Sequence, residues 1–384
     1  MNYLASLVEP YAQHTVAFLC IFTAVVFAHE LGHYLVARWC GVRVEVFSIG
    51  FGPEMFGWTD RHATRWRVSW LPFGGYIRMF GDAPADIPAS PNSAQVPGAP
   101  SEAPIDPALR PFSFAYKSVA ARAAIVFAGP LANFVLAVVV LAVLFATLGQ
   151  QLTSTVIGKV YPASAAAEAG LLPGDKILSL NGQKVARFED IADIVLLGLG
   201  EPLTVSIQRN GTTLNLQATP HVIEEADIFG TVHRIGRLGI ESSGPGEIVH
   251  YDPATAGWMA VVETYRRAAD ILKSLEQIVT GVRPPKEVGG ILSIAKMSGD
   301  IAGRGLIDAI DFAMLLSINL GLLNLFPIPL LDGGRLLFYA FEAVRGRPLG
   351  PRAEEWGFRV GFALVLSLML FATWNDLMRF KVFH

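Results

Sequence analysis

The chain has 384 residues, of which 52% are hydrophobic and only 16% are charged, and its formal net charge is −3 at pH 7. Soluble domains typically carry about 25% charged residues, so this composition favours a membrane protein. A charge so close to zero argues against a nucleic-acid partner, and two cysteines are too few for a disulfide framework.

Four segments are apolar and long enough to cross a bilayer as helices, which takes about 20 residues. They run from His14 to Arg38, from Ala123 to Leu148, from Phe312 to Leu331 and from about Trp356 to Trp374. The first fourteen residues contain Glu9 and no Lys or Arg, so no cleavable signal peptide is expected. We therefore predict a polytopic α-helical membrane protein.

The distribution of Lys and Arg predicts how these segments are oriented. Cytoplasmic connections carry an excess of both residues. Here they are frequent between the first and second segments and between the third and fourth, and they are absent before the first. Both termini, and the long stretch between the second and third segments, are therefore predicted to lie on the outer side.

The connections differ in character. Residues 41–81 alternate β-forming residues with Gly and predict short strands or hairpins on the cytoplasmic side. Residues 82–111 are rich in Pro, Ala and Ser and predict a flexible linker. On the outer side, residues 150–220 predict a small sheet with two helices, and Asn210-Gly211 is a strong hairpin signal.

The region of residues 221–306 is predicted to contain an amphipathic helix from about Ala254 to Thr280. Its apolar residues, among them Trp258, Tyr265 and Leu272, recur at helical spacing. This stripe is compatible with packing against the rest of the protein and equally with the membrane surface. The chain has no internal repeat, which argues against a transporter.

The sharpest motif is His29-Glu30-Leu31-Gly32-His33, near the end of the first apolar segment. Histidines four residues apart share one face of a helix, so both imidazoles can reach a single zinc ion, with Glu30 as base on a water molecule. The alternative is a chance pair of polar residues on a soluble helix. The apolar surroundings favour the metal, because ionisable residues there are costly unless they are paired or coordinated.

Asp332, at the end of the third apolar segment, is the predicted third ligand. Hydrolytic zinc sites use three protein ligands and one open position. The alternative for Asp332 is a helix-end residue at the membrane interface. The first and third segments run in the same direction, so His29, His33 and Asp332 should lie at similar depth. Pro327 and Pro329 interrupt the third segment, and non-helical backbone at that depth requires protein or a water-filled cavity beside it.

These motifs together resemble the site-2 protease family of intramembrane zinc metalloproteases, in its bacterial form that cleaves anti-sigma factors. The resemblance covers nearly the whole chain. Besides the first motif, it includes the second motif Asn324-Leu325-Phe326-Pro327-Ile328-Pro329-Leu330-Leu331-Asp332-Gly333-Gly334, the core helix Phe127-Ala128-Gly129-Pro130-Leu131-Ala132-Asn133, the membrane-associated β-loop around Gly74-Gly75-Tyr76, and the PDZ signature Gly170-Leu171-Leu172-Pro173-Gly174-Asp175-Lys176-Ile177. Two departures are that one PDZ domain is recognisable where the closest relatives have two, and that the linker at residues 82–111 is long.

The resemblance implies a role for each motif. His29, His33 and Asp332 would bind zinc, and Glu30 would be the general base. Asn324 would help hold the substrate backbone, Pro327 and Pro329 would shape the cleft, and the β-loop with Gly75 and Tyr76 would offer an edge strand to an unwound substrate. From the residues alone, Asn133, Asn319 and Asn324 are amides in or near apolar helices, where hydrogen bonds between helices and a functional role are both open.

The resemblance also implies the partners and the setting. The substrate would be a single-span membrane protein, such as an anti-sigma factor or a remnant signal peptide, in the bacterial inner membrane, with lipid as the other partner and no nucleic acid. The PDZ domain would gate access from the periplasm. A non-catalytic PDZ scaffold is the rival hypothesis, and it predicts a chain without stoichiometric zinc.

The predicted order of parts follows from these assignments. It is a first transmembrane helix at 1–40, the β region at 41–81, the linker at 82–111, a second transmembrane helix at 112–149, the α+β PDZ domain at 150–220, the connecting region at 221–306, a third transmembrane helix at 307–345, and a fourth with the tail at 346–384.

Overall fold

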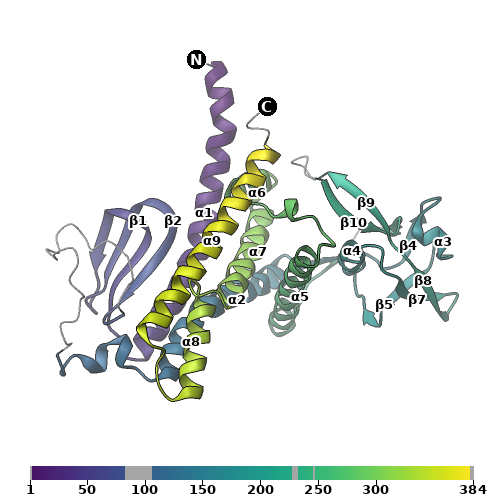
Figure 1. Cartoon of the computed structure of the whole chain (residues 1–384). Coiled ribbons are helices and arrows are strands. Elements are labelled where there is room, and N and C mark those ends of the chain that lie inside the picture. Colours follow the sequence, from purple (N-terminus) through teal and green to yellow (C-terminus); the bar gives the residue numbers. More distant parts are fainter. Residues whose placement is uncertain (1, 83–105, 227–231, 245–246, 381–384) are drawn as a thin grey trace. The chain divides into compact units, whose positions relative to one another are not determined.

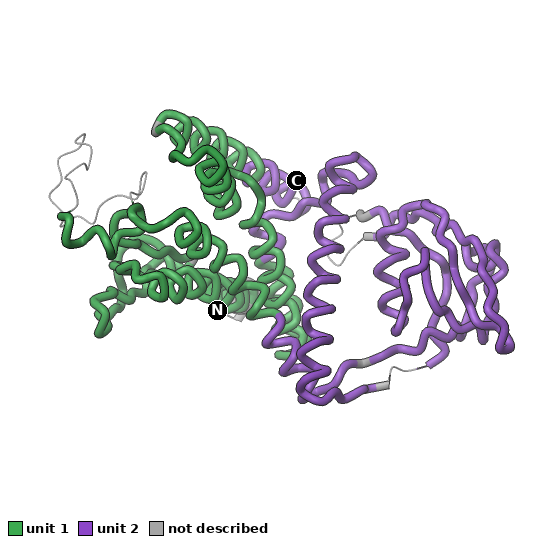
Figure 2. Tube along the Cα trace, turned by 90° about the horizontal axis from the view of Figure 1, so that it is seen from below, with its two compact units in different colours: residues 1–137, 295–368 green, residues 138–294, 369–384 purple. Residues whose placement is uncertain are grey.

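The computed structural model describes residues 2–82, 106–226, 232–244 and 247–380. The chain forms two compact units, which Figure 2 shows in different colours. Unit 1 comprises Met1–Ala137 and Ala295–Leu368, and unit 2 comprises Val138–Ile294 and Met369–His384. Most of the predicted linker at 82–111 lies outside the described residues.

Four described helices are long and apolar enough to cross a membrane. Their apolar stretches cover His14–Trp39, Val119–Thr147, Leu306–Asn324 and Arg352–Arg379. They belong to helices α1 (Asn2–Trp39), α2 (Val119–Thr147), α7 (Leu306–Asn324) and α9 (Pro351–Arg379), labelled in Figure 1. The four apolar segments predicted from the sequence are thus confirmed as helices of sufficient length.

The third segment ends earlier than predicted. Helix α7 stops at Asn324 and does not continue to Leu331. Pro327 and Pro329 follow, and each lacks a backbone donor and disfavours helix in the residue before it. The chain therefore passes through a short non-helical stretch before helix α8 (Asp332–Arg345) begins.

Glycines allow three helices of unit 1 to approach closely. A Cβ at Gly32 of α1 would lie 2.3 Å from the carbonyl oxygen of Ala128 in α2, and one at Gly321 of α7 would lie 3.0 Å from the α2 backbone. The Ser317 hydroxyl of α7 donates a 3.0 Å hydrogen bond to the Asn133 carbonyl oxygen of α2. Small residues and such hydrogen bonds hold helices together in a bilayer, where the hydrophobic effect between helices is absent.

Strands β1 (Val44–Thr59) and β2 (Arg65–Met79) form the β region predicted at 41–81. They pair antiparallel, and both bend, so that residues 46–49 have partners on one side at 65–68 and on the other at 75–78. Residues 75–79, which we call the edge strand, pair on one side only within the described part of the chain. Buried residues of β1, including Phe47, pack in one cluster with residues of α1 and α2.

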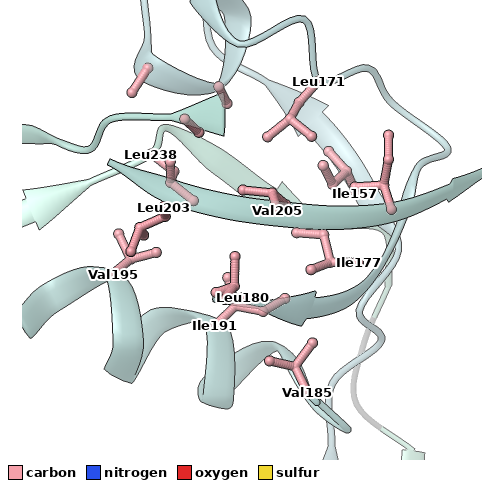
Figure 3. Packing of buried hydrophobic residues seen from close by; sticks show 14 residues of the cluster. Ile157, Leu171, Ile177, Leu180, Val185, Ile191, Val195, Leu203, Val205 and Leu238 are labelled. Atoms are coloured by element: carbon pink, nitrogen blue, oxygen red, sulfur yellow. The ribbon is translucent and has the colours of Figure 1, made fainter. Parts of the chain in front are cut away.

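Unit 2 contains a small α/β domain with a four-stranded sheet of order β6-β5-β7-β8. Its elements are β4 (Ile157–Val160), α3 (Ala165–Glu168), β5 (Lys176–Leu180), β6 (Gln183–Lys184), α4 (Phe188–Leu197), β7 (Leu203–Arg209) and β8 (Thr212–Ala218). Figure 3 shows Leu180 of β5 next to Ile191 of α4 in its buried core. The predicted sheet and helices within 150–220 are present in the structure.

One strand of this domain lies beyond the predicted end at residue 220. Strand β11 (Ile240–Ser242) pairs antiparallel with β4, and Leu238 belongs to the same core. A strand that returns after an excursion of the chain leaves no local signal, so the sequence prediction ends the domain too early.

The remaining elements connect this domain to the apolar helices. Strand β3 (Gln150–Leu152) pairs with β12 (Glu247–Val249), and β9 (His221–Ala226) pairs with β10 (Val232–Arg237). Helix α5 (Pro253–Val279) is the predicted amphipathic helix, and α6 (Ile291–Ala302) follows it.

The buried face of α5 consists of alanines and a carboxylate rather than of the large apolar residues of the predicted stripe. Ala256, Ala260 and Glu263 are buried, whereas Trp258 and Tyr265 are 67% and 76% exposed. Glu263 forms a 2.7 Å ion pair with Arg187, the residue that precedes α4. Helix α5 therefore contacts the α/β domain through this face and leaves the predicted apolar stripe uncovered.

Ile207→Ala is expected to destabilise the α/β domain by about 2–5 kcal/mol, because Ile207 is fully buried and its truncation leaves a cavity. Its cross-strand partner Leu214 is 37% exposed, so Leu214→Ala should cost far less. Thermal unfolding of each purified variant, monitored by the susceptibility of the α/β domain to limited proteolysis, measures the difference in stability loss. Equal losses of stability in the two variants would contradict the assigned core.

Candidate metal centre

Helix α1 presents His29 and His33 on one face, one turn apart. Their Nε2 atoms lie 3.3 Å apart, and both side chains are buried. Two buried ring nitrogens at this distance need a polar partner, because an unsatisfied polar group is costly in apolar surroundings.

Asp332 joins the two histidines as the first residue of α8. Its Oδ2 atom lies 3.2 Å from His29 Nε2 and 3.5 Å from His33 Nε2. Gly333 and Gly334 make this position possible, because a Cβ at either would come within 2.3 Å of a backbone carbonyl oxygen of residues 325–328. The helix can therefore begin directly against the non-helical stretch, which fixes the carboxylate.

The other ring nitrogen of each histidine is also held. His33 Nδ1 donates a 2.8 Å hydrogen bond to the Ile125 carbonyl oxygen, and His29 Nδ1 lies 3.2 Å from the side-chain amide of Asn133. A hydrogen bond donated from Nδ1 selects the tautomer whose Nε2 carries a lone pair. The Nε2 lone pair of His33 is thereby directed at the place where Asp332 ends, and the Asn133 amide, whose Nδ2 faces His29 Nδ1, holds the second ring in position.

The three donor atoms fit one zinc ion. With bonds of about 2.0–2.1 Å, tetrahedral zinc holds neighbouring ligand atoms about 3.4 Å apart. The separations are 3.2, 3.3 and 3.5 Å. Two imidazoles and a carboxylate leave the fourth position open, as hydrolytic zinc sites require. No other group of three or more potential His, Cys, Asp or Glu ligands occurs among the described residues.

The Asp332 side chain is suited to bind a cation. Its Oδ2 atom faces both histidines, and a carboxylate can balance part of the charge of a divalent metal.

A cavity of about 220 Å³ adjoins the three donors, entirely within unit 1. Its lining comprises His29, Glu30, His33, Tyr76, Ile77, Met79, Asp82, Val126, Asn324, Leu330, Leu331, Asp332 and Arg335. Glu30 shares the cavity with the donors, so its carboxylate can reach a water molecule there. The edge strand supplies Tyr76, Ile77 and Met79.

The structure brings together most of the site residues predicted from the sequence. His29, Glu30, His33, Asn324, Asp332 and Tyr76 line the cavity. Gly75 lies beside it, where a Cβ would come 3.2 Å from Glu30 Cγ. Pro327 and Pro329 do not line it; they shape the stretch before α8, and Pro329 packs against Gly361 of α9.

Two residues of α2 contact the zinc donors without having been predicted to do so. Asn133 contacts His29, whereas the sequence left open whether this amide joins helices or serves the site. A Cβ at Gly129 would lie 2.2 Å from His33 Nε2, so the ring fits only against glycine. Gly129 and Asn133 are four residues apart and therefore share one helix face, but this spacing does not show that the face meets α1.

Four described helices of membrane-spanning length and a two-histidine, one-carboxylate centre are the features of a membrane metalloprotein. The chain belongs to Peptidase family M50, which matches it over residues 17–368. It is 43% identical over 369 residues to a Rhizobium meliloti (strain 1021) protein named as a zinc metalloprotease, covering 95% of this chain and 96% of that one. Metalloprotease MmpA of Caulobacter vibrioides is 38% identical, and the match covers 96% of this chain and 96% of that protein. Zinc metalloprotease RasP of Geobacillus kaustophilus is 33% identical, and the match covers 95% of this chain and 98% of that protein.

The predicted family and activity are thereby confirmed. The chain is a zinc metalloprotease of the site-2 type, its cofactor is zinc, and it is a multi-pass membrane protein.

Asn133→Ala is expected to lower the affinity for zinc about 10–100-fold, because the partner that orients His29 is lost. Competition with a chromophoric chelator on the purified protein measures this affinity. Asn319→Ala is the matched control, since Asn319 is an amide of α7 that does not line the cavity. Unchanged zinc affinity in Asn133→Ala would mean that this amide serves only to join helices.

Proposed function

We propose that this protease performs regulated intramembrane proteolysis, hydrolysing a peptide bond within the transmembrane segment of a single-span protein already trimmed on its outer side. The observation that carries the proposal is the cavity shared by three zinc donors and Glu30 among helices of membrane-spanning length. Ionisable groups in such surroundings are costly and mark functional sites.

The residues of the cavity would divide the chemistry between them. His29, His33 and Asp332 would hold the zinc ion, which acidifies water and polarises the scissile carbonyl group when it is bound. Glu30 would accept a proton from the attacking water and deliver it to the leaving nitrogen, so that the amide becomes a carboxylate and an amine. Asn133 would keep the His29 ring oriented throughout.

The edge strand would hold the substrate in extended form. Backbone hydrogen bonds shield a peptide bond within a helix, so the substrate must unwind, and a free strand edge stabilises the unwound form by strand addition. Tyr76 and Ile77 line the cavity, which supports this role. Asn324 would bind the substrate backbone through its amide, and Pro327 and Pro329 would keep the adjoining stretch open.

The sheet that carries the edge strand would lie against the membrane. Phe56 and Trp70 are 65% and 66% exposed, which supports contact with lipid. The uncovered stripe of α5, with Trp258 and Tyr265, would lie on the opposite membrane surface in the same manner.

The α/β domain would be a periplasmic PDZ domain that hinders full-length substrates and admits trimmed ones. Support comes from the stretch of residues 170–177, in which the Leu172 N–H donates a 2.8 Å hydrogen bond to Asp175 Oδ2 and so closes the loop before β5. The distribution of Lys and Arg supports an inner-membrane enzyme with both termini on the periplasmic side and the metal centre towards the cytoplasm. Anti-sigma factors, remnant signal peptides or both would be the substrates.

Glu30→Gln is expected to keep zinc and to lose at least about 10²–10⁴-fold in cleavage rate, because the amide cannot accept the proton. The assay uses the protein in liposomes with a tagged single-span reporter whose outer part has been removed, and zinc is counted by atomic absorption. Chelator-treated wild type serves as the second inactive sample. Cleavage by Glu30→Gln at the wild-type rate would remove Glu30 from the mechanism.

Gly75→Val is expected to slow cleavage while zinc stays bound, because its side chain would press on Glu30, Val26 and the Ser48 carbonyl oxygen and push the edge strand away. Gly350→Val is the control, since Gly350 lies outside the sheet, its φ is not in the left-handed region, and nothing lies within 4 Å of a Cβ there. Equal activity of the two variants would argue against substrate binding along residues 75–79.

A further inference from the structure

We propose that the ion pair between Asp82 and Arg335 is a latch that holds the edge strand in register with the metal centre, so that a substrate bound along this strand is cut at one position. The latch deepens the strand-addition role proposed for residues 75–79 and rests on it. Neither residue belongs to a motif of the sequence, and both line the cavity.

Asp82 is fixed to the end of the edge strand by a tight turn. Its N–H donates a 3.2 Å hydrogen bond to the carbonyl oxygen of Met79, the last residue of the strand. Gly81 lies between them with a φ of 72°, in the left-handed region that favours glycine. Phe80 donates a further 2.8 Å hydrogen bond to the Arg43 carbonyl oxygen. A shift of the edge strand must therefore move the Asp82 carboxylate with it.

Arg335 is fixed in the same way to the metal centre. It follows Asp332 by three residues in the first turn of α8, so the two side chains lie on one face of the helix. Helix α8 is itself tied to α2 by Arg122, whose Nη2 lies 2.6 Å from Glu342 Oε1 and whose guanidinium group lies over the Tyr339 ring. Arg335 therefore marks a fixed position relative to the zinc donors.

The pair joins these two fixed points beside the cavity. Arg335 Nη1 lies 3.4 Å from Asp82 Oδ2. Arg335 is also the one Lys or Arg among the residues that line the cavity. Since the guanidinium group carries five donors in a planar fork, it can keep its bond to Asp82 while the strand adjusts slightly.

The strength of the pair suits a latch that must open for a substrate. The side chains of Arg335 and Asp82 are 46% and 25% exposed, so water weakens their attraction. A register constraint is needed at this edge, because a bound strand that slips by two residues keeps the same side chains on the same face. For a substrate paired in a given register, the position of the edge strand relative to the zinc donors decides which peptide bond reaches them, and the pair between Asp82 and Arg335 fixes that position.

The test measures where the protein cuts. Asp82→Asn, Arg335→Gln, Arg335→Lys and the exchange Asp82→Arg with Arg335→Asp are made in the full chain and reconstituted in liposomes. The probe is a reporter with one apolar span of about 20 residues, a central Gly-Ser pair and a short outer tail. Zinc content, kcat, KM and the cut position, by mass spectrometry, are recorded. Arg345→Gln is the matched control, because it removes the same charge from the exposed end of α8.

Asp82→Asn and Arg335→Gln are each expected to keep zinc and a kcat close to that of wild type, and to raise KM about threefold to fivefold. Both should also add cuts two residues away from the main one. Arg335→Lys should keep a single cut, and the exchange Asp82→Arg with Arg335→Asp should restore one, because each variant has a pair of opposite charges at these two positions. Arg345→Gln should behave as wild type.

An unchanged single cut in both Asp82→Asn and Arg335→Gln would overturn the latch, and so would an effect of Arg335→Gln that Asp82→Asn does not share. Loss of zinc in either variant would show a merely structural role and overturn it as well. Failure of the protease mechanism is read separately, from Glu30→Gln: if that variant cuts the reporter at the wild-type rate, the assignment of Glu30 fails whatever the latch variants do.

Discussion

The cost of holding ionisable side chains among apolar helices governs the structure of unit 1. Two histidines and a carboxylate in such surroundings must be coordinated, and coordination requires their donor atoms to converge within a few ångströms. Convergence in turn requires the helices to pack backbone to backbone, which Gly32, Gly129 and Gly321 permit. Residues that contact no metal are thereby constrained as strictly as the donors: a side chain at Gly129 would occupy the space of the His33 ring.

The break between α7 and α8 places the third zinc donor and makes room for the cavity beside it. A continuous helix would carry Asp332 beyond the depth of the histidines and would leave no room beside them. Because Pro327 and Pro329 end helical structure and Gly333 and Gly334 allow a new helix to start at once, the carboxylate stands at a helix N-terminus, where the helix dipole favours an anion. The same break brings Leu330 and Leu331 into the cavity wall. Hydrolysis consumes water, so an opening of this kind in the helical packing is a chemical requirement.

Catalysis stands on helices, whereas the proposed substrate binding stands on the edge of a β-sheet. The zinc donors stand on helices whose packing resists displacement, whereas the proposed substrate contacts stand on a strand that pairs on one side only among the described residues. Helices give precise geometry but no free backbone groups, and a strand edge gives free groups but no fixed register. The proposed latch between Asp82 and Arg335 supplies what the strand edge lacks. In unit 2, the charged contact of α5 with the α/β domain likewise leaves an apolar stripe available for another surface.

The sequence by itself determined the four apolar helices, the face shared by His29 and His33, and the arrival of Asp332 at their depth. Each is a local pattern, set by hydropathy over about 20 residues, by helical spacing or by the direction of a segment. Only the tertiary structure decided that Asn133 meets His29, that Tyr76 and Ile77 of the edge strand line the cavity, that β11 returns to complete the α/β domain, and that Asp82 meets Arg335. These contacts join residues far apart in the chain. They depend on how whole elements pack, so they leave no periodicity or spacing that the sequence alone could show.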